Sequence, residues 1–143
     1  MRYAPNSLLL ELHVPSFEPV KKYYKRLGFK IVWSRERDDA GDYLVLRREN
    51  TILCFWPGNE SIYKQTYFSR FSKKTKRGYG VEIVIMVHDI DSLYKRAKRF
   101  AKVVEKLKGQ PWGLKDFRVE DPFGYYIRFT EYHNILSKSN AVS

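Results

Sequence analysis

Hydrophobic and polar residues alternate at the start of the chain. Every second residue from 8 to 14 is Leu or Val, whereas the positions between them include Glu11 and His13. This period of two predicts a β-strand over 8–14 with one deeply buried face. Pro15 ends the strand because proline cannot donate to a hydrogen-bonded ladder. Glu11 and His13 are therefore expected to share the opposite face.

The pattern then changes to helical spacing. Ser16 is expected to cap a helix and Gly28 to end it. Its buried stripe is predicted from apolar residues three or four positions apart: Phe17, Val20, Tyr24 and Leu27. Three strand-like runs follow, over residues 29–34, 43–48 and 51–56. The first half of the chain therefore reads strand, helix, strand, strand, strand.

The second half repeats this order. A strand is predicted over 81–87 and a helix capped by Asp89, and a shift of 73 residues aligns this helix with the first one. Its stripe comprises Ile90, Leu93, Ala97 and Phe100. Strands over 103–107, 115–120 and 125–130 complete the copy, the last two joined by a turn at 121–124. The sequence thus predicts an α+β fold of two tandem βαβββ modules.

These patterns divide a single domain of residues 1–143 into four segments. The modules span about 8–57 and 80–131, separated by a connector over about 58–79. The four-residue spacing of Tyr63, Tyr67 and Phe71 predicts a short amphipathic helix in that connector, which could also act as a lid. The polar tail, 132–143, is expected to fray.

Charge and cysteine content set the broad class. The chain has 27 Lys and Arg against 16 Asp and Glu, a formal charge of +11. Most of this excess falls on the expected wet faces of the helices and in the connector, and no recognised nucleic-acid-binding motif accompanies it. Binding of nucleic acid therefore ranks third among the possible functions. A lone cysteine, Cys54, indicates a cytoplasmic protein, and neither a signal peptide nor a membrane span is expected.

Three motifs in a fixed order resemble a known superfamily. They are YYKRLGF at 23–29, VHDIDSL at 87–93, and QPWG at 110–113 followed by DPFGYYIRF at 121–129. Together they resemble the glyoxalase, bleomycin-resistance and extradiol-dioxygenase group, the vicinal oxygen chelate superfamily, over residues 8–131. The resemblance implies two modules whose curved sheets enclose a cup with the helices outside. Within the group, the chain is most similar to metal-free, bleomycin-resistance-like members.

Metal enzymes of that superfamily carry ligands on the first and last strand of each module. The matching positions here are Leu9, Leu53 or Cys54, Glu82 and Arg128. Leucine offers no lone pair, and the guanidinium of arginine repels a divalent cation. The resemblance therefore implies a protein without a metal or another cofactor.

Two roles are open for the charged residues at these positions. Glu82 and Arg128 could form a two-pronged ion pair that fills the vacated site. Alternatively, Arg128 could hold the carboxylate or phosphate of a ligand while Glu82 orients it.

The other candidates are expected to line the cup. His13 could contact a ligand or act as a base, or it could be hydrogen-bonded to a neighbour. Glu11 shares its face. Among the aromatic residues Trp56 and Trp112 are the best candidates because strand ends and loops surround the mouth of a cup, and Tyr126 could join them. No nucleophile, base and orienting group form a recognisable catalytic arrangement, so no catalytic residue is assigned.

Two functions lead. The first is metal-free binding or sequestration of a small aromatic or anionic molecule by a homodimer. The second is a lyase or dioxygenase-type enzyme with a relocated metal site built from Glu11, His13, Cys54 or Glu82. The residues favour the first, because the metal-ligand positions are lost.

Overall fold

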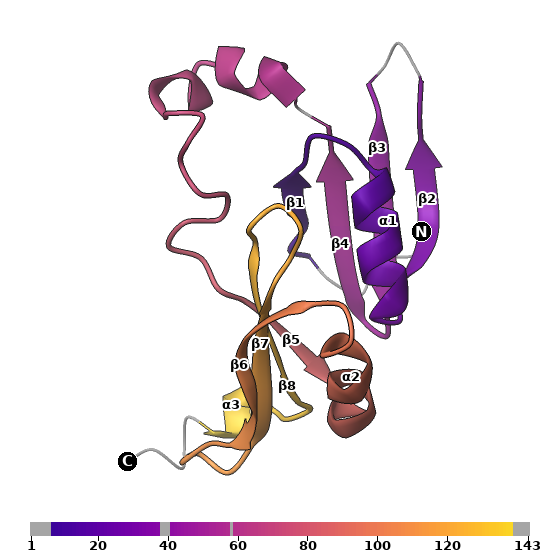
Figure 1. Ribbon diagram of the computed structural model, residues 1–143, viewed down its shortest axis with the longest axis vertical. Helices are drawn as coiled ribbons and strands as arrows, with labels where there is room; N and C mark the ends of the chain where they lie inside the picture. Colours follow the sequence, from indigo (N-terminus) through magenta and orange to yellow (C-terminus); the bar gives the residue numbers. More distant parts are fainter. Residues whose placement is uncertain (1–6, 38–40, 58, 139–143) are drawn as a thin grey trace. The chain divides into compact units, whose positions relative to one another are not determined.

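The protein consists of two sheets of the same topology, each accompanied by one long helix (Figure 1). A computed structural model describes residues 7–37, 41–57 and 59–138, without the side chains of 59–61 and 138. The chain divides into two compact units, one containing residues up to Tyr79 together with Pro122–Gly124, and the other the remaining residues from Gly80 onward. The predicted α+β fold of two tandem βαβββ modules is confirmed, and the cup stays a prediction.

The first unit contains the first module and the connector. Its elements are β1 (Leu10–His13), α1 (Glu18–Arg26), β2 (Lys30–Arg35), β3 (Tyr43–Arg48) and β4 (Thr51–Trp56). The strand order is β1-β4-β3-β2, with β1 parallel to β4 and the other pairs antiparallel. Two 3₁₀ helices follow, η1 (Asn59–Lys64) and η2 (Phe68–Arg70).

The second unit repeats this arrangement. Its elements are β5 (Ile83–Val87), α2 (Ile90–Ala97), β6 (Lys102–Gly109), β7 (Lys115–Glu120), β8 (Tyr126–Glu131) and the short α3 (Ile135–Lys138). The strand order is β5-β8-β7-β6, with β5 parallel to β8. Asp121 closes the turn between β7 and β8, because its Oδ1 accepts a hydrogen bond from the backbone N–H of Tyr125 at 2.9 Å.

The core of each unit lies between the helix and one face of its sheet. In the first unit Leu12, Phe55 and Leu44 occupy one row of that face, and Tyr24 of α1 packs its ring 5.4 Å from that of Phe55. The corresponding row in the second unit is Ile85, Phe129 and Phe117, with the ring of Tyr94 of α2 5.1 Å from that of Phe117. All six row residues are buried. The predicted alternation is therefore correct, and it places every second strand residue against a helix.

Two local predictions were wrong. The N-cap of α1 is Phe17 rather than Ser16, with no side-chain hydrogen bond, so Pro19 and Glu18 in the first turn mark the helix start better than the serine does. The connector forms two 3₁₀ helices rather than one amphipathic α-helix, and Tyr67 and Phe71 remain exposed. A single short helix is marginal unless it buries an apolar face, and these rings bury little.

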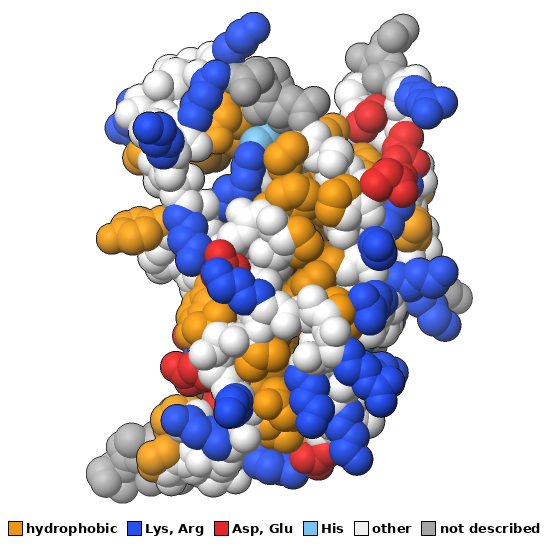
Figure 2. Space-filling model, viewed as in Figure 1, with side chains coloured by type: hydrophobic (Ala, Val, Ile, Leu, Met, Phe, Trp, Pro, Cys, Tyr) orange, Lys and Arg blue, Asp and Glu red, His pale blue; other side chains and the backbone are white. Residues whose placement is uncertain are grey.

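The positive charge is distributed as expected. Figure 2 shows Lys and Arg side chains over the connector helices and over α2. No helix in the described ranges is both long and apolar enough to cross a bilayer. In the tail, Ile135 and Leu136 of α3 are exposed, and residues 139–143 lie outside the described part of the chain.

Candidate functional site

Each sheet has a second face, turned away from its helix, which we call the open face. In the first unit one row of this face contains Glu11, Cys54, Val45 and Trp33, which pair in register across β1, β4, β3 and β2. Cys54 therefore occupies the last-strand position that the sequence left undecided, whereas Leu53 is buried toward α1. The thiol is free and buried.

A tyrosine and a glutamate are joined on this open face. The hydroxyl of Tyr43 donates to Oε2 of Glu11 at 2.7 Å. Burial, followed by this hydrogen bond, raises the pKa of Tyr43. The phenol therefore stays protonated at neutral pH and acts as a hydrogen-bond donor rather than as a base.

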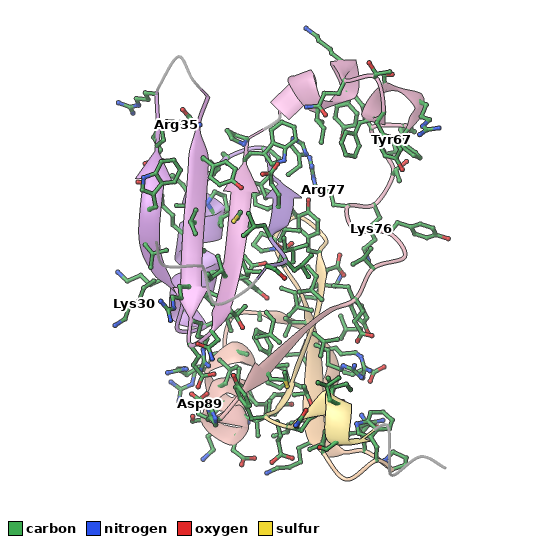
Figure 3. The ribbon with its side chains drawn as sticks, turned by 180° about the vertical axis from the view of Figure 1, so that it is seen from behind. Lys30, Arg35, Tyr67, Lys76, Arg77 and Asp89 are labelled. Atoms are coloured by element: carbon green, nitrogen blue, oxygen red, sulfur yellow. The ribbon has the colours of Figure 1, made fainter. Side chains whose placement is uncertain are left out.

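His13 lies at the edge of the same face and has a partner from the connector. NH1 of Arg77 contacts Nδ1 of the imidazole and donates to the His13 carbonyl oxygen at 3.3 Å (Figure 3). Because a guanidinium only donates, Nδ1 must be the acceptor and the ring neutral. Burial, and then the charge of Arg77, lowers the pKa of His13 to about 4. Trp56 packs against the imidazole with ring centroids 5.2 Å apart.

The second unit carries charged side chains in the equivalent places. Val84, Arg128, Arg118 and Glu105 pair in one row of its open face. Arg118 donates from Nε to Glu82 Oε1 and from NH1 to Glu105 Oε2, both at 2.7 Å. This side chain is only 13% exposed, and its partners hold it across the sheet.

Arg128 makes weaker contacts than predicted. Its Nε lies 3.7 Å from Oε1 of Glu82, and its NH1 lies 3.9 Å from Oδ2 of Asp116. Both distances exceed those of hydrogen bonds. Of the two roles left open for these residues, the two-pronged Glu82–Arg128 pair is therefore not formed, because Arg118 takes the same glutamate oxygen at 2.7 Å.

Asp116 is the most deeply buried charged group of the second open face. Its side chain is 1% exposed, and its Oδ1 accepts a hydrogen bond from Nε2 of Gln110 at 2.8 Å. Oδ2 of Asp116 and Nε of Arg128 are buried and have no hydrogen-bond partner among the described residues. A buried donor and a buried acceptor without hydrogen bonds are each costly unless another group binds them.

Sequence reasoning missed Asp116, Arg118 and Glu105. The signal was available in β7, where Asp116, Arg118 and Glu120 alternate with Phe117 and Val119. Such alternation indicates a charged face opposite a buried one. What the pattern could not reveal is that Arg118, rather than Arg128, holds Glu82.

The seven predicted site residues lie in two units. Glu11, His13 and Trp56 lie on the open face of the first, and Glu82, Tyr126 and Arg128 on that of the second. Trp112 is in the loop before β7 and is 49% exposed. Their roles in binding stay predictions.

The side chains that could ligate a metal ion were compared across the described part of the chain. No group of three or more His, Cys, Asp or Glu side chains there is arranged to hold a metal ion. The residues at the superfamily's ligand positions also fit a cation poorly, because Leu9 lacks a donor atom and Arg128 carries a positive charge.

The sequence matches the model of the Glyoxalase/Bleomycin resistance protein/Dioxygenase superfamily over residues 8–129. The chain belongs to this superfamily. No curated protein matches the sequence.

Solved structures share the superfamily fold. A hypothetical protein from S. aureus is 22% identical with a TM-score of 0.67, and the match covers 88% of this chain and 93% of that one. TioX from Micromonospora sp. ML1 is 20% identical with a TM-score of 0.65, covering 90% and 98%. A bleomycin-binding protein complexed with bleomycin is 20% identical with a TM-score of 0.58, covering 90% and 99%. At these identities the likeness establishes the fold alone.

Proposed function

We propose that the protein is a metal-free member of the superfamily that binds a small aromatic molecule carrying a polar group. The observation that carries the proposal is Arg128. It stands at a ligand position of the metal enzymes, yet its guanidinium makes no hydrogen bond within the described residues. A partly buried guanidinium of this kind is suited to hold a polar group of a ligand.

The surroundings of Arg128 support binding rather than a purely structural role. Arg118 donates two hydrogen bonds at 2.7 Å to Glu82 and Glu105, so its role is to hold side chains of the sheet together. Arg128 is 24% exposed and lies two residues after Tyr126, so both project from the same face of β8. An aromatic ring and a free donor on one face can bind a flat polar molecule.

Relatives provide a second line of support. One structural neighbour is a bleomycin-binding protein complexed with bleomycin, which makes small-molecule binding a function that this fold performs. This chain carries a formal charge of +11, which favours a neutral or anionic ligand over a cationic one.

Two further parts of the proposal concern assembly and location. We propose a homodimer, which light scattering of the purified protein tests directly, since a monomeric mass would exclude it. We also propose a cytoplasmic location, supported by the free, buried thiol of Cys54. Fractionation of the producing cells tests the location.

Binding is tested by thermal shift of the chelator-treated protein against a panel of small metabolites. A ligand of the native state raises the melting temperature in proportion to its occupancy. We expect aromatic compounds with a polar substituent to raise it and Arg128→Met to abolish the shift. The matched control is Arg99→Met, which alters an exposed arginine just beyond α2. The proposal fails if no compound stabilises the protein, or if every stabilising compound requires an added divalent metal.

A further inference from the structure

Two buried atoms of opposite hydrogen-bonding character belong to neighbouring, oppositely charged side chains of the second unit, Arg128 and Asp116. Nε of Arg128 is a donor and Oδ2 of Asp116 is an acceptor, and neither has a hydrogen-bond partner among the described residues. The NH1 group of the same arginine lies 3.9 Å from that carboxylate oxygen, which is too far for a hydrogen bond. The arginine and the aspartate thus form a long ion pair without a hydrogen bond between them.

The neighbours hold these two groups in place without satisfying them. Gln110 fixes the orientation of Asp116 by donating to Oδ1 at 2.8 Å, so Oδ2 points away from that bond. Thr130 is opposite Asp116 in the register, but its hydroxyl donates to the carbonyl oxygen of Lys115 at 3.5 Å. Lys108 is opposite Asp116 on the other side and forms no ion pair with it within the described part of the unit.

The charge of the cluster limits what can bind. Among the described residues, the carboxylates of Glu82, Glu105 and Asp116 contact two guanidiniums, those of Arg118 and Arg128. These five groups therefore carry one net negative charge. A bare carboxylate or phosphate placed beside Arg128 would approach the unpaired oxygen of Asp116, and the repulsion would offset its attraction to the arginine.

We propose that Arg128 and Asp116 together recognise an uncharged group that presents a hydrogen-bond acceptor next to a donor, such as a carboxamide or a lactam. The carbonyl oxygen of the ligand accepts from Arg128, and its N–H donates to Oδ2 of Asp116. The pairing satisfies both buried atoms and adds no charge to the cluster. This inference rests on the proposed binding function and narrows its ligand class to neutral amide-like aromatics.

Three probes of nearly equal shape test this recognition. Benzamide presents an acceptor and a donor, benzoate two acceptors, and benzamidinium two donors. Binding of each is measured by ligand-observed NMR titration of the full chain. We expect benzamide to bind about ten-fold more tightly than either charged probe, because a mismatched probe leaves one buried group unpaired.

Two substitutions should change this preference in opposite directions. In Asp116→Asn, Gln110 continues to donate to the amide oxygen, so the new NH₂ group replaces Oδ2 and the site offers donors only. Benzoate should then overtake benzamide. Arg128→Met removes the donor and the positive charge, so benzamidinium should overtake benzamide. Arg99→Met is the control and should leave the order of the three probes unchanged.

Folding of each variant is checked by circular dichroism and urea unfolding, because Asp116 is buried and its variant could unfold. Arg128 is partly exposed, and its variant suffices if Asp116→Asn does not fold. The inference is overturned if benzoate binds the parent protein most tightly, or if Arg128→Met leaves the order unchanged. It is also overturned if none of the three probes binds, in which case water alone bridges the two groups.

These failures differ from failure of the proposed function. Should the metabolite panel yield ligands whose binding is insensitive to Asp116→Asn, the protein binds small molecules and only the amide-specific pairing is wrong. Should the panel yield no ligand at all, the binding function itself is rejected.

Discussion

The two modules are alike on one side of the sheet and different on the other. Toward the helix, Leu12, Leu44 and Phe55 of the first module correspond to Ile85, Phe117 and Phe129 of the second. On the open face, Cys54 and Val45 of the first module correspond to Arg128 and Arg118 of the second. The helix-facing residues are apolar in both modules, whereas these open-face positions are apolar in the first module and charged in the second.

The reason lies in what each face contributes to folding. The helix-facing residues are buried in both modules, and their burial supplies most of the free energy of folding. The open faces can carry different chemistry, provided that their buried polar groups find partners. In the second module Arg118 hydrogen-bonds to Glu82 and Glu105. By contrast, Nε of Arg128 and Oδ2 of Asp116 have no hydrogen-bond partner among the described residues. The comparison thus separates residues that stabilise the module from residues available for binding.

The largest effect is expected where the modules are alike. Phe55→Ala and Phe129→Ala remove equivalent, fully buried rings, and each should lower the free energy of unfolding by about 3–5 kcal/mol. Urea unfolding monitored by circular dichroism measures both. A loss below about 1 kcal/mol in either variant would show that the two helix-facing cores are not equivalent.

A smaller effect is expected where the modules differ. Arg118→Met leaves Glu82 and Glu105 without their 2.7 Å hydrogen bonds and should cost about 2 kcal/mol, since both carboxylates are partly exposed. The matched variant in the first module, Val45→Ala, only trims an apolar side chain and should cost about 1 kcal/mol. Urea unfolding measures both, with the Arg118 loss decreasing at high salt. Equal, salt-independent losses would contradict an ionic role for Arg118.

The third effect concerns pH and belongs to the first module. The pKa of His13 is about 4 in the folded protein, below the ordinary value of 6.5, because of burial and the charge of Arg77. Between these two pKa values the imidazole binds a proton in the unfolded chain but not in the folded protein. The free energy of unfolding therefore decreases as the pH falls from 6.5 toward 4. His13→Met introduces the residue found at the equivalent position of the second module, Met86. This variant should lose less stability over the pH range than the parent protein does. Urea midpoints of both proteins across the range measure the difference, and identical slopes would contradict the neutral, buried state of His13.

Much of the fold could be predicted from the sequence because burial imposes regular periods. The strands at 43–48, 51–56 and 115–120 were predicted with the bounds that the structure gives. The same alternation placed Glu11 with His13 on one face. It could not predict the connector, because Tyr67 and Phe71 have helical spacing but bury no common face.

The site was harder to predict because it depends on contacts between strands. Residue spacing placed Glu82 and Arg128 at related positions, but the choice of Arg118 as the partner of Glu82 depends on β7 lying beside β8. Arg77 contacts His13 although the two residues are 64 positions apart in the sequence, and no local sequence pattern predicts this contact. Such pairings follow from tertiary structure rather than from periodicity.

The central claim is that an arginine and its neighbours have replaced the metal chemistry of this superfamily in the second module. Metal analysis by mass spectrometry tests it most directly, on protein purified without chelator and then dialysed against Zn²⁺, Mn²⁺ or Fe²⁺. If Arg128 has taken the place of the metal, no stoichiometric divalent ion will be found before or after dialysis. One tightly held divalent ion per chain in the parent protein would contradict this claim.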